Sequence, residues 1–206
     1  PRDLTRLPLA QLRAGLTNPV LLLLALSAAL PNMVSYGTSL VAAGWLAETH
    51  GVSLAASAGI VAGAKIVAVL TGSTVTGILL ARAMAPLRLY AGMAVVGVLA
   101  QLLLFVPVSP FVAAVAGLMG WIFAFGALSG VCMALLPRVA ERAGGAGLGA
   151  GIVNQFVSLA SFLTPAIYFG LSSWQAWVAL AAGALTVGVT ALRQAGRMTG
   201  EDGLSA

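Results

Sequence analysis

Charged side chains are scarce in this chain of 206 residues. Asp, Glu, Lys and Arg together make up 7% of the sequence, whereas 60% of the residues are hydrophobic and the mean hydropathy is +1.04. Soluble domains normally carry about 25% charged residues. The scarcity of charge therefore excludes a soluble domain and predicts an integral membrane protein.

Histidine and cysteine are almost absent. The chain contains one of each, His50 and Cys132. An internal disulfide is therefore excluded, and we expect Cys132 to be a small buried hydrophobic side chain. None of the long apolar runs contains an acidic residue. One histidine, one cysteine and no intramembrane carboxylate do not supply the usual ligands of a metal site, so no metal cofactor is expected.

The same absences bear on catalysis and on coupling. Rhomboid-type intramembrane proteases need a serine in Gly-x-Ser-Gly and a histidine inside the membrane. The nearest match, residues 127–130, lacks the first glycine, and His50 falls in a predicted outer loop. Without a base beside the serine there is no activated nucleophile, so we expect that the protein is not an enzyme. Proton coupling usually needs an intramembrane Asp, Glu or His, so either this segment does not hold the coupling site or the protein is not proton-driven by that route.

Long apolar runs are abundant. A helix needs about 20 apolar residues to cross the hydrocarbon of a bilayer, and six runs approach or exceed that length: 19–46, 54–80, 88–106, 110–136, 147–170 and 174–192. They predict an all-α integral membrane protein, with a cytoplasmic segment (1–18), a six-transmembrane-helix bundle (19–192) and a cytoplasmic tail (193–206). Runs one to three and four to six would have opposite topology, as in the 3+3 inverted repeats of many secondary transporters.

Basic residues are distributed asymmetrically about these runs. With six spans, nine of the ten Lys and Arg residues fall on one side: Arg2, Arg6, Arg13, Arg82, Arg88, Arg138, Arg142, Arg193 and Arg197. By the positive-inside rule this side is the cytoplasm, so we expect both termini there and the protein in the inner or plasma membrane. The basic residues are spread between apolar runs and form no cluster, which argues against a nucleic-acid partner.

The tenth basic residue, Lys65, lies near the middle of the second run. A lone charge inside the membrane is costly and marks a functional site by default. In one interpretation Lys65 lines an aqueous cavity and attracts an anionic solute, or it pairs with a carboxylate from elsewhere. In the other it packs against hydroxyl and carbonyl groups or extends to the membrane interface. Such extension is difficult from mid-span, which favours the cavity.

Two further runs carry polar residues on one helical face. Residues 32, 35, 36 and 39 have the spacing i, i+3, i+4 and i+7, and the fifth run repeats this pattern with residues 154, 158 and 161. These stripes either face a substrate or form hydrogen bonds between helices, and both interpretations stay open. The expected substrate-binding residues are Asn32, Ser35, Tyr36, Ser39, Lys65, Asn154 and Ser158.

Glycine is frequent, with 25 residues in the chain. Gly59 and Gly63 in the second run, and Gly147 and Gly151 in the fifth, are each four residues apart. This spacing lets two membrane helices approach closely, so we expect close helix contacts at both pairs.

Four stretches resemble the C-terminal six-helix half of the major facilitator superfamily. Residues 12–19 resemble the end of the central cytoplasmic loop, and residues 36–53 resemble the end of the seventh helix and the outer loop after it. Residues 137–165 resemble the tenth and eleventh helices. The fourth stretch resembles the glycine- and arginine-containing loop signature of the family, and its matching residues are Gly77, Arg82 and Arg88.

This resemblance implies a secondary active transporter that works by alternating access on a small solute, anionic or amphiphilic. It also implies a further six-helix half, N-terminal to this segment in the same polypeptide, with the substrate cavity between the halves near mid-membrane. The lipid bilayer and the solute are the other expected partners. The alternative is a non-transporting six-helix membrane module or a channel subunit that assembles with copies of itself.

Overall fold

Helices joined by short turns make up the part of the chain that is described. The computed structural model describes residues 9–142 and 145–199, and it contains no strand within those ranges. The helices are α1 (Leu9–Leu16), α2 (Pro19–His50), α3 (Leu54–Ala81), α4 (Pro86–Phe105), α5 (Phe111–Arg142), α6 (Ala146–Gly170) and α7 (Trp174–Thr199). Six of them, α2 to α7, are long and apolar enough to cross a membrane. The predicted all-α bundle of six spans is confirmed, and the chain is a multi-pass membrane protein.

Local capping signals set the starts of two spans. Pro19 occupies the first position of α2, and the side chain of Asn18 accepts a hydrogen bond from the Leu21 N–H. Ser53 caps α3 in the same way. The ends of two spans lie beyond the predicted apolar runs. α5 continues past residue 136 to Arg142, and α7 continues past residue 192 to Thr199. Hydropathy marks the part of a helix that lies in hydrocarbon, whereas its backbone hydrogen bonds continue into the interface.

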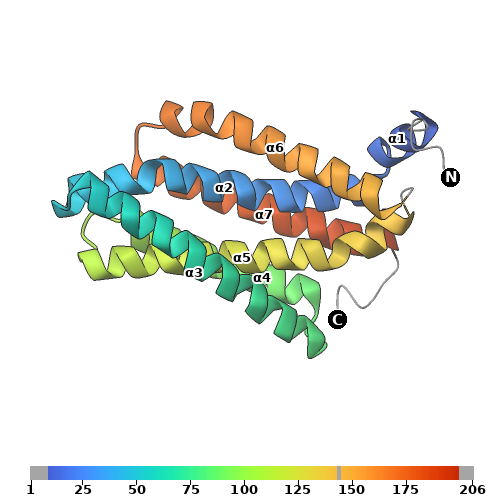
Figure 1. Cartoon of the computed structure of the whole chain (residues 1–206), viewed down its shortest axis with the longest axis horizontal. Helices are drawn as coiled ribbons and strands as arrows, with labels where there is room; N and C mark the ends of the chain where they lie inside the picture. Colours follow the sequence, from blue (N-terminus) through green and yellow to red (C-terminus); the bar gives the residue numbers. More distant parts are fainter. Residues whose placement is uncertain (1–8, 143–144, 200–206) are drawn as a thin grey trace.

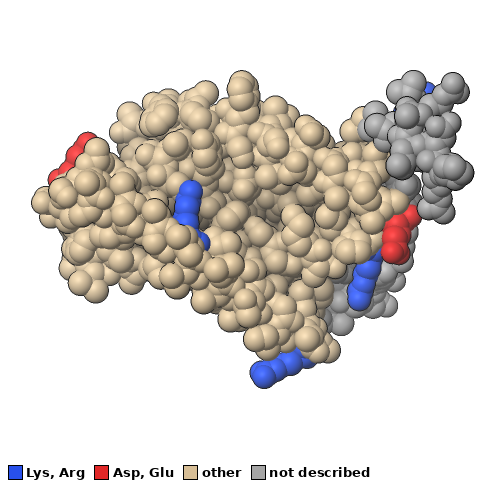
Figure 2. Space-filling model, in the orientation of Figure 1, with Lys and Arg blue, Asp and Glu red and all other residues tan. Residues whose placement is uncertain are grey.

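The long helices run alternately in opposite directions. α1, the α3–α4 turn, the start of α6 and the end of α7 lie together, at what we call the α1 end of the bundle (Figure 1). The α2–α3, α4–α5 and α6–α7 turns lie at the opposite end, called the far end. Charged side chains gather mostly at these two ends, and a basic side chain also lies on the broad face between them (Figure 2).

Contacts between the helices follow a two-fold pattern. α3 packs mainly against α5, and α6 packs in the equivalent way against α2. Likewise α4 packs against α5 and α7 packs against α2, while α2 with α5 and α4 with α7 join the two triplets. Because α2 starts at the α1 end and α5 starts at the far end, the triplets α2–α4 and α5–α7 have opposite orientations. This is the inverted arrangement that the sequence predicts.

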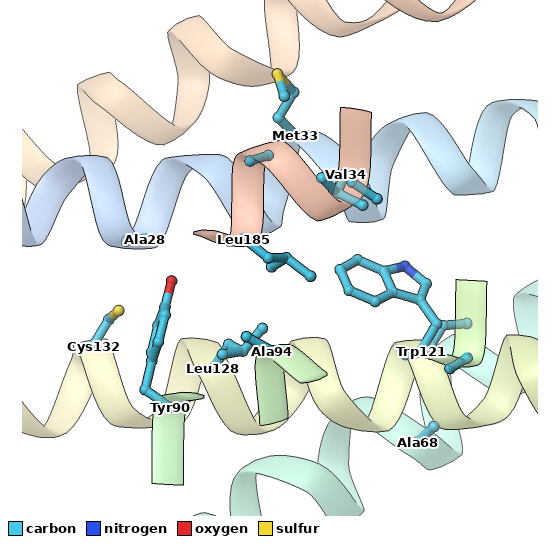
Figure 3. Close-up of a cluster of buried hydrophobic side chains, with 14 of the residues drawn as sticks. Ala28, Met33, Val34, Ala68, Tyr90, Ala94, Trp121, Leu128, Cys132 and Leu185 are labelled. Atoms are coloured by element: carbon cyan, nitrogen blue, oxygen red, sulfur yellow. The ribbon is translucent and has the colours of Figure 1, made fainter. Parts of the chain in front are cut away.

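The core lies between α2, α4, α5 and α7 (Figure 3). Trp121 and Leu185 meet at Gly97, where an added Cβ atom would lie 2.9 Å from the indole ring and 3.4 Å from the Leu185 side chain. Glycine at this position of α4 therefore lets the large indole ring sit against the helix backbone. Cys132 is 2% exposed in the same core, so the expectation of a small buried side chain is confirmed.

Hydrogen bonds tie three of these helices together. The Tyr90 hydroxyl on α4 donates to the Ser27 carbonyl oxygen on α2 at 2.6 Å. The Ser27 hydroxyl in turn shares its hydrogen between the Leu23 carbonyl oxygen of its own helix at 2.8 Å and the Gly188 carbonyl oxygen on α7 at 3.1 Å. Tyr90, Ser27 and Gly188 are buried. Polar contacts in such a position stabilise one arrangement of the helices, because the alternative is an unpaired polar group in an apolar core.

Replacing Tyr90 with phenylalanine is expected to lower the free energy of unfolding by about 1 kcal/mol. The substitution keeps the ring but leaves the buried Ser27 carbonyl without this donor. Tyr36→Phe is the matched control, since that side chain is 41% exposed. Unfolding of both variants in detergent micelles measures the difference, and equal changes would contradict a stabilising role for the Tyr90 hydroxyl.

Aromatic residues close the far end of the bundle. Trp45 on α2, Phe105 on α4 and Trp177 on α7 form three edge-to-face contacts, with ring centroids 5.9, 6.1 and 5.2 Å apart. Trp45 Nε1 also donates to the Leu104 carbonyl oxygen, and Trp177 Nε1 donates to the Tyr168 carbonyl oxygen at the end of α6. Four helices are therefore joined at this end.

Candidate functional site

A cavity of about 210 Å³ lies where α2, α3, α5 and α6 meet. Its lining residues are Asn32, Ser35, Tyr36, Lys65, Val69, Phe125 and Ser161. α2 supplies the first three, α3 supplies Lys65 and Val69, and α5 and α6 supply one residue each. Residues that are far apart in the sequence are thus brought to one place near the middle of the spans.

Asn32 joins α2 to α6 at the edge of the cavity. Its side-chain Nδ2 donates to Ser161 Oγ at 2.7 Å, and the Ser161 hydroxyl donates to the Val157 carbonyl oxygen of its own helix at 2.9 Å. This bond fixes the orientation of the Asn32 amide. Its oxygen, Oδ1, accepts no hydrogen bond from the residues that the structure describes, so it remains an acceptor for a bound molecule or water.

Lys65 is the cation of the cavity. Its side chain is half-buried, and no carboxylate lies within 4 Å of its ammonium group among the described residues. The acidic residues of the described helices, Glu48 and Glu141, lie near the ends of α2 and α5. An ammonium group at mid-membrane needs water or an anion as its partner, because it is otherwise very costly to keep there.

The remaining polar residues of α2 differ in their surroundings. Ser35 is 6% exposed, whereas the Tyr36 side chain is 41% exposed. Ser39 follows one turn later and is half-buried, and its hydroxyl donates to the Ser35 carbonyl oxygen at 2.7 Å. Ser39 does not line the cavity. The structure therefore does not bring Ser39 to the site.

Two predicted residues on α6 also lie outside the cavity. Asn154 and Ser158 are exposed on the helix, on the side of Ser161 that leads toward the α1 end. The cavity therefore contains Asn32, Ser35, Tyr36 and Lys65 from the predicted set, but not Ser39, Asn154 or Ser158.

Three lining residues were not among the predicted site residues. Ser161 belongs to the stripe that contains Asn154 and Ser158, and Val69 follows Lys65 by one helical turn. Both positions were therefore visible as helix periodicity in the sequence. Phe125 reads as an ordinary packing residue, and only the contact of α5 with α3 brings it to the cavity.

The predicted loop motif lies away from this cavity, at the α1 end. Arg82 follows the last residue of α3, Arg88 is in the first turn of α4, and both side chains are exposed. Gly77 is exposed and has no atom within 4 Å of an added Cβ. A hollow of about 390 Å³ beside the turn is lined by residues that include Met84 and Arg138.

The cavity lining offers hydrogen-bond donors, one cation and two aromatic rings, but no acidic side chain. No three His, Cys, Asp or Glu side chains come together as metal ligands within residues 9–142 and 145–199. Such a set of groups suits the binding of a small anion. No protein-family model and no curated protein matches the sequence.

Proposed function

We propose that this chain is half of a secondary active transporter that moves a small anionic solute by alternating access. The observation that carries the proposal is the cavity in which Lys65, Asn32 and Tyr36 meet near mid-span. Secondary transporters bind their solutes near the bilayer midplane, at the interface of repeats of inverted topology. The anionic character of the solute follows from the unpaired ammonium group and the absence of a carboxylate from the lining.

The two-fold contact pattern of α2–α4 and α5–α7 supports this assignment. It agrees with the resemblance of the sequence to the C-terminal half of the major facilitator superfamily, and we propose membership of that superfamily. Binding and translocation, and not catalysis, are the proposed activities. In support, Ser129 lies within α5 while His50 is at the far end of α2, where its ring contacts Phe111 with a centroid distance of 5.6 Å.

The proposed partner is an N-terminal six-helix half of the same polypeptide. α3 and α6 are the least buried spans. Only 22% and 17% of the residues in their apolar 18-residue stretches are buried, against 61% for α2. These two helices flank the cavity and leave it open on one side. A second half that covers α3 and α6 would complete the cavity.

We further propose that the α1 end faces the cytoplasm and that the protein lies in the inner or plasma membrane. Basic side chains at helix ends on the cytoplasmic side are the strongest known determinant of orientation. Those at the α1 end include Arg13, Arg82, Arg88, Arg138, Arg193 and Arg197. At the far end, the described residues include Glu48 and no Lys or Arg.

A second candidate function is a self-assembling six-helix module or channel subunit. The observation that favours it concerns the two predicted glycine pairs, Gly59 and Gly63 on α3 and Gly147 and Gly151 on α6. None of these glycines has an atom within 4 Å of an added Cβ, so all four leave room for another helix. The expected close contacts at these pairs are therefore not made within the described part of the chain. A second copy of the chain would use the same surfaces that we assign to an N-terminal half.

The mass of the intact protein from its native membrane distinguishes the two candidates. For a transporter with two halves we expect one polypeptide of roughly twice the 20.7 kDa of this chain. The same preparation, reconstituted in vesicles, should exchange small organic anions across the bilayer. A polypeptide of 20.7 kDa that forms dimers and exchanges no anion would overturn the proposal in favour of the self-assembling module.

A further inference from the structure

A groove of about 400 Å³ runs between α4 and α7. Residues within 91–99 of α4 form one wall, and residues within 182–190 of α7 form the other. None of the helices that line the Lys65 cavity contributes to this groove. It also lies apart from α3 and α6, whose open surfaces we assign to a second half. The groove therefore stays open to lipid when the proposed second half is in place.

The groove is lined by alanine, valine, leucine and two threonines. The two threonines are Thr186 and Thr190. Their hydroxyl groups donate to the Ala182 and Thr186 carbonyl oxygens of their own helix, each at 2.8 Å. Threonines within helices commonly bond in this way, so neither hydroxyl hydrogen is left unpaired toward the groove. A hydrocarbon chain can therefore lie there without burying an unpaired donor.

The groove runs from the α1 end toward the middle of the membrane. α4 begins and α7 ends at the α1 end. The stretch 91–99 is about 12 Å long at the helical rise of 1.5 Å per residue. One leaflet supplies half of a hydrocarbon core of about 30 Å. The groove therefore has nearly the length of the hydrocarbon layer of one leaflet.

Two arginines stand beside the groove at the α1 end. Arg88 precedes Ala91 by one turn of α4, and Arg193 follows Thr190 by one turn of α7. Residues one turn apart lie on the same side of a helix, so each arginine continues the wall that its own helix contributes. Both side chains are exposed.

The packing of the two helices brings these arginines to the same level. Leu185 of α7 lies against Gly97 of α4, where an added Cβ would be 3.4 Å from its side chain. The Tyr90 hydroxyl of α4 lies 2.6 Å from an added Cβ on Gly188 of α7. Because the helices are antiparallel, a step back along α4 matches a step forward along α7. Counting from these two contacts places the arginine of α4 level with positions 190–194, the stretch that holds the arginine of α7.

Acidic side chains are scarce around this pair. Neither α4 nor the described part of α7 carries one, and the acidic residue described at the α1 end is Glu141 on α5. The guanidinium group of arginine binds phosphate oxygens through paired hydrogen bonds. The α1 end of the groove is therefore suited to a phosphate group, and its length is suited to hydrocarbon.

We propose that this groove binds one phospholipid with an anionic headgroup, from the leaflet at the α1 end. The phosphate group binds between Arg88 and Arg193, and one acyl chain fills the space between α4 and α7. Two cations favour a headgroup of net negative charge over a zwitterionic one, and basic sites at the cytoplasmic surface commonly recognise such lipids. The inference concerns a surface other than the solute cavity, and it requires only that the chain spans a membrane.

Native mass spectrometry of the whole protein, titrated with phosphatidylglycerol, tests the headgroup contacts. Phosphatidylcholine with the same acyl chains is the zwitterionic comparison and should bind more weakly. Arg88→Gln and Arg193→Gln should each weaken phosphatidylglycerol binding about fivefold, and the double variant about 30-fold. Arg82→Gln is the matched control, because Arg82 is also exposed at the α1 end but follows α3, away from the groove. It should leave the affinity unchanged.

Ala182→Phe tests the acyl chain separately. Ala182 is half-buried and lines the groove at its mid-membrane end, so phenylalanine fills space there while both arginines remain. Binding of phosphatidylglycerol with palmitoyl chains should weaken, whereas binding of the hexanoyl form should not change, because its chains end before this position. Inorganic phosphate at millimolar concentration should not displace the lipid. Equal binding of the two headgroups, an equal effect of Arg82→Gln, no effect of Ala182→Phe, or displacement by phosphate would overturn the lipid site.

Discussion

Lys65→Gln is expected to lower the affinity for the transported anion by about 10- to 100-fold, which is the usual cost of losing a hydrogen bond to a charged group. Lys65 is the only cation among the lining residues, and the groups around it are neutral. Glutamine keeps a polar side chain of similar length but removes the charge. Uptake of a radiolabelled organic anion into vesicles, measured over a range of concentrations, gives the change in apparent affinity.

Lys65→Arg is the matched control, because it retains the charge at the same position. We expect its affinity to lie within about tenfold of the original, since the larger guanidinium group alters geometry but still attracts an anion. Neither variant should lose thermal stability, because no carboxylate partner of Lys65 occurs in the described residues. Transport by Lys65→Gln with unchanged affinity would remove the proposed role of this residue while leaving the fold as it is.

The spans were predictable from the sequence because membrane crossing is a local property. A run of about 20 apolar residues is sufficient to indicate each helix, and all six runs correspond to helices α2 to α7. The starts of α2 and α3 agree with the starts of the apolar runs at residues 19 and 54, where the structure adds the caps Asn18 and Ser53. The ends of α5 and α7 were missed, because these helices continue into polar sequence where hydropathy no longer indicates them.

The cavity was predictable only in part. Lys65 stood out as a charge inside an apolar run, and the periodicity of α2 indicated Asn32 and Tyr36. Which stripes meet depends on how the helices pack, and this is not a local property. Ser158 belongs to the same stripe as Ser161, yet Ser161 lines the cavity and Ser158 lies beyond it.

Glycine spacing was a weaker guide to helix contacts. The sequence indicated Gly59 and Gly63 as contact points on α3, but nothing in the described chain lies near either of them. The close approach of α3 to α5 instead uses Gly72, which has no glycine four residues away, and Gly126, which is followed by Gly130 one turn later. A glycine therefore indicates where another helix can approach closely. Whether a helix does approach there depends on how the whole bundle packs.

Gly72→Ala is expected to lower the free energy of unfolding by about 3 kcal/mol, from overpacking and the loss of one buried hydrogen bond. An added Cβ on Gly72 would collide with the Phe123 carbonyl oxygen, a backbone atom of α5 that cannot rotate away. An added Cβ on Gly126 would lie 2.6 Å from the Val69 carbonyl oxygen of α3. The backbones of α3 and α5 therefore lie directly against each other at these two glycines. Separating them would also break the 3.3 Å hydrogen bond from the Thr76 hydroxyl to the Ala127 carbonyl oxygen.

Gly92→Ala on α4 provides the comparison of opposite sign. Gly92 is exposed, and nothing lies within 4 Å of an added Cβ, so alanine should raise stability by up to about 1 kcal/mol through its helix propensity. Unfolding of both variants in mixed detergent micelles measures the two free energies. Since α3 carries Lys65, Gly72→Ala should also impair anion binding, whereas Gly92→Ala should not. Equal stability of the two variants would show that α3 and α5 do not pack through Gly72, and the wall of the cavity formed by these helices would have to be redrawn.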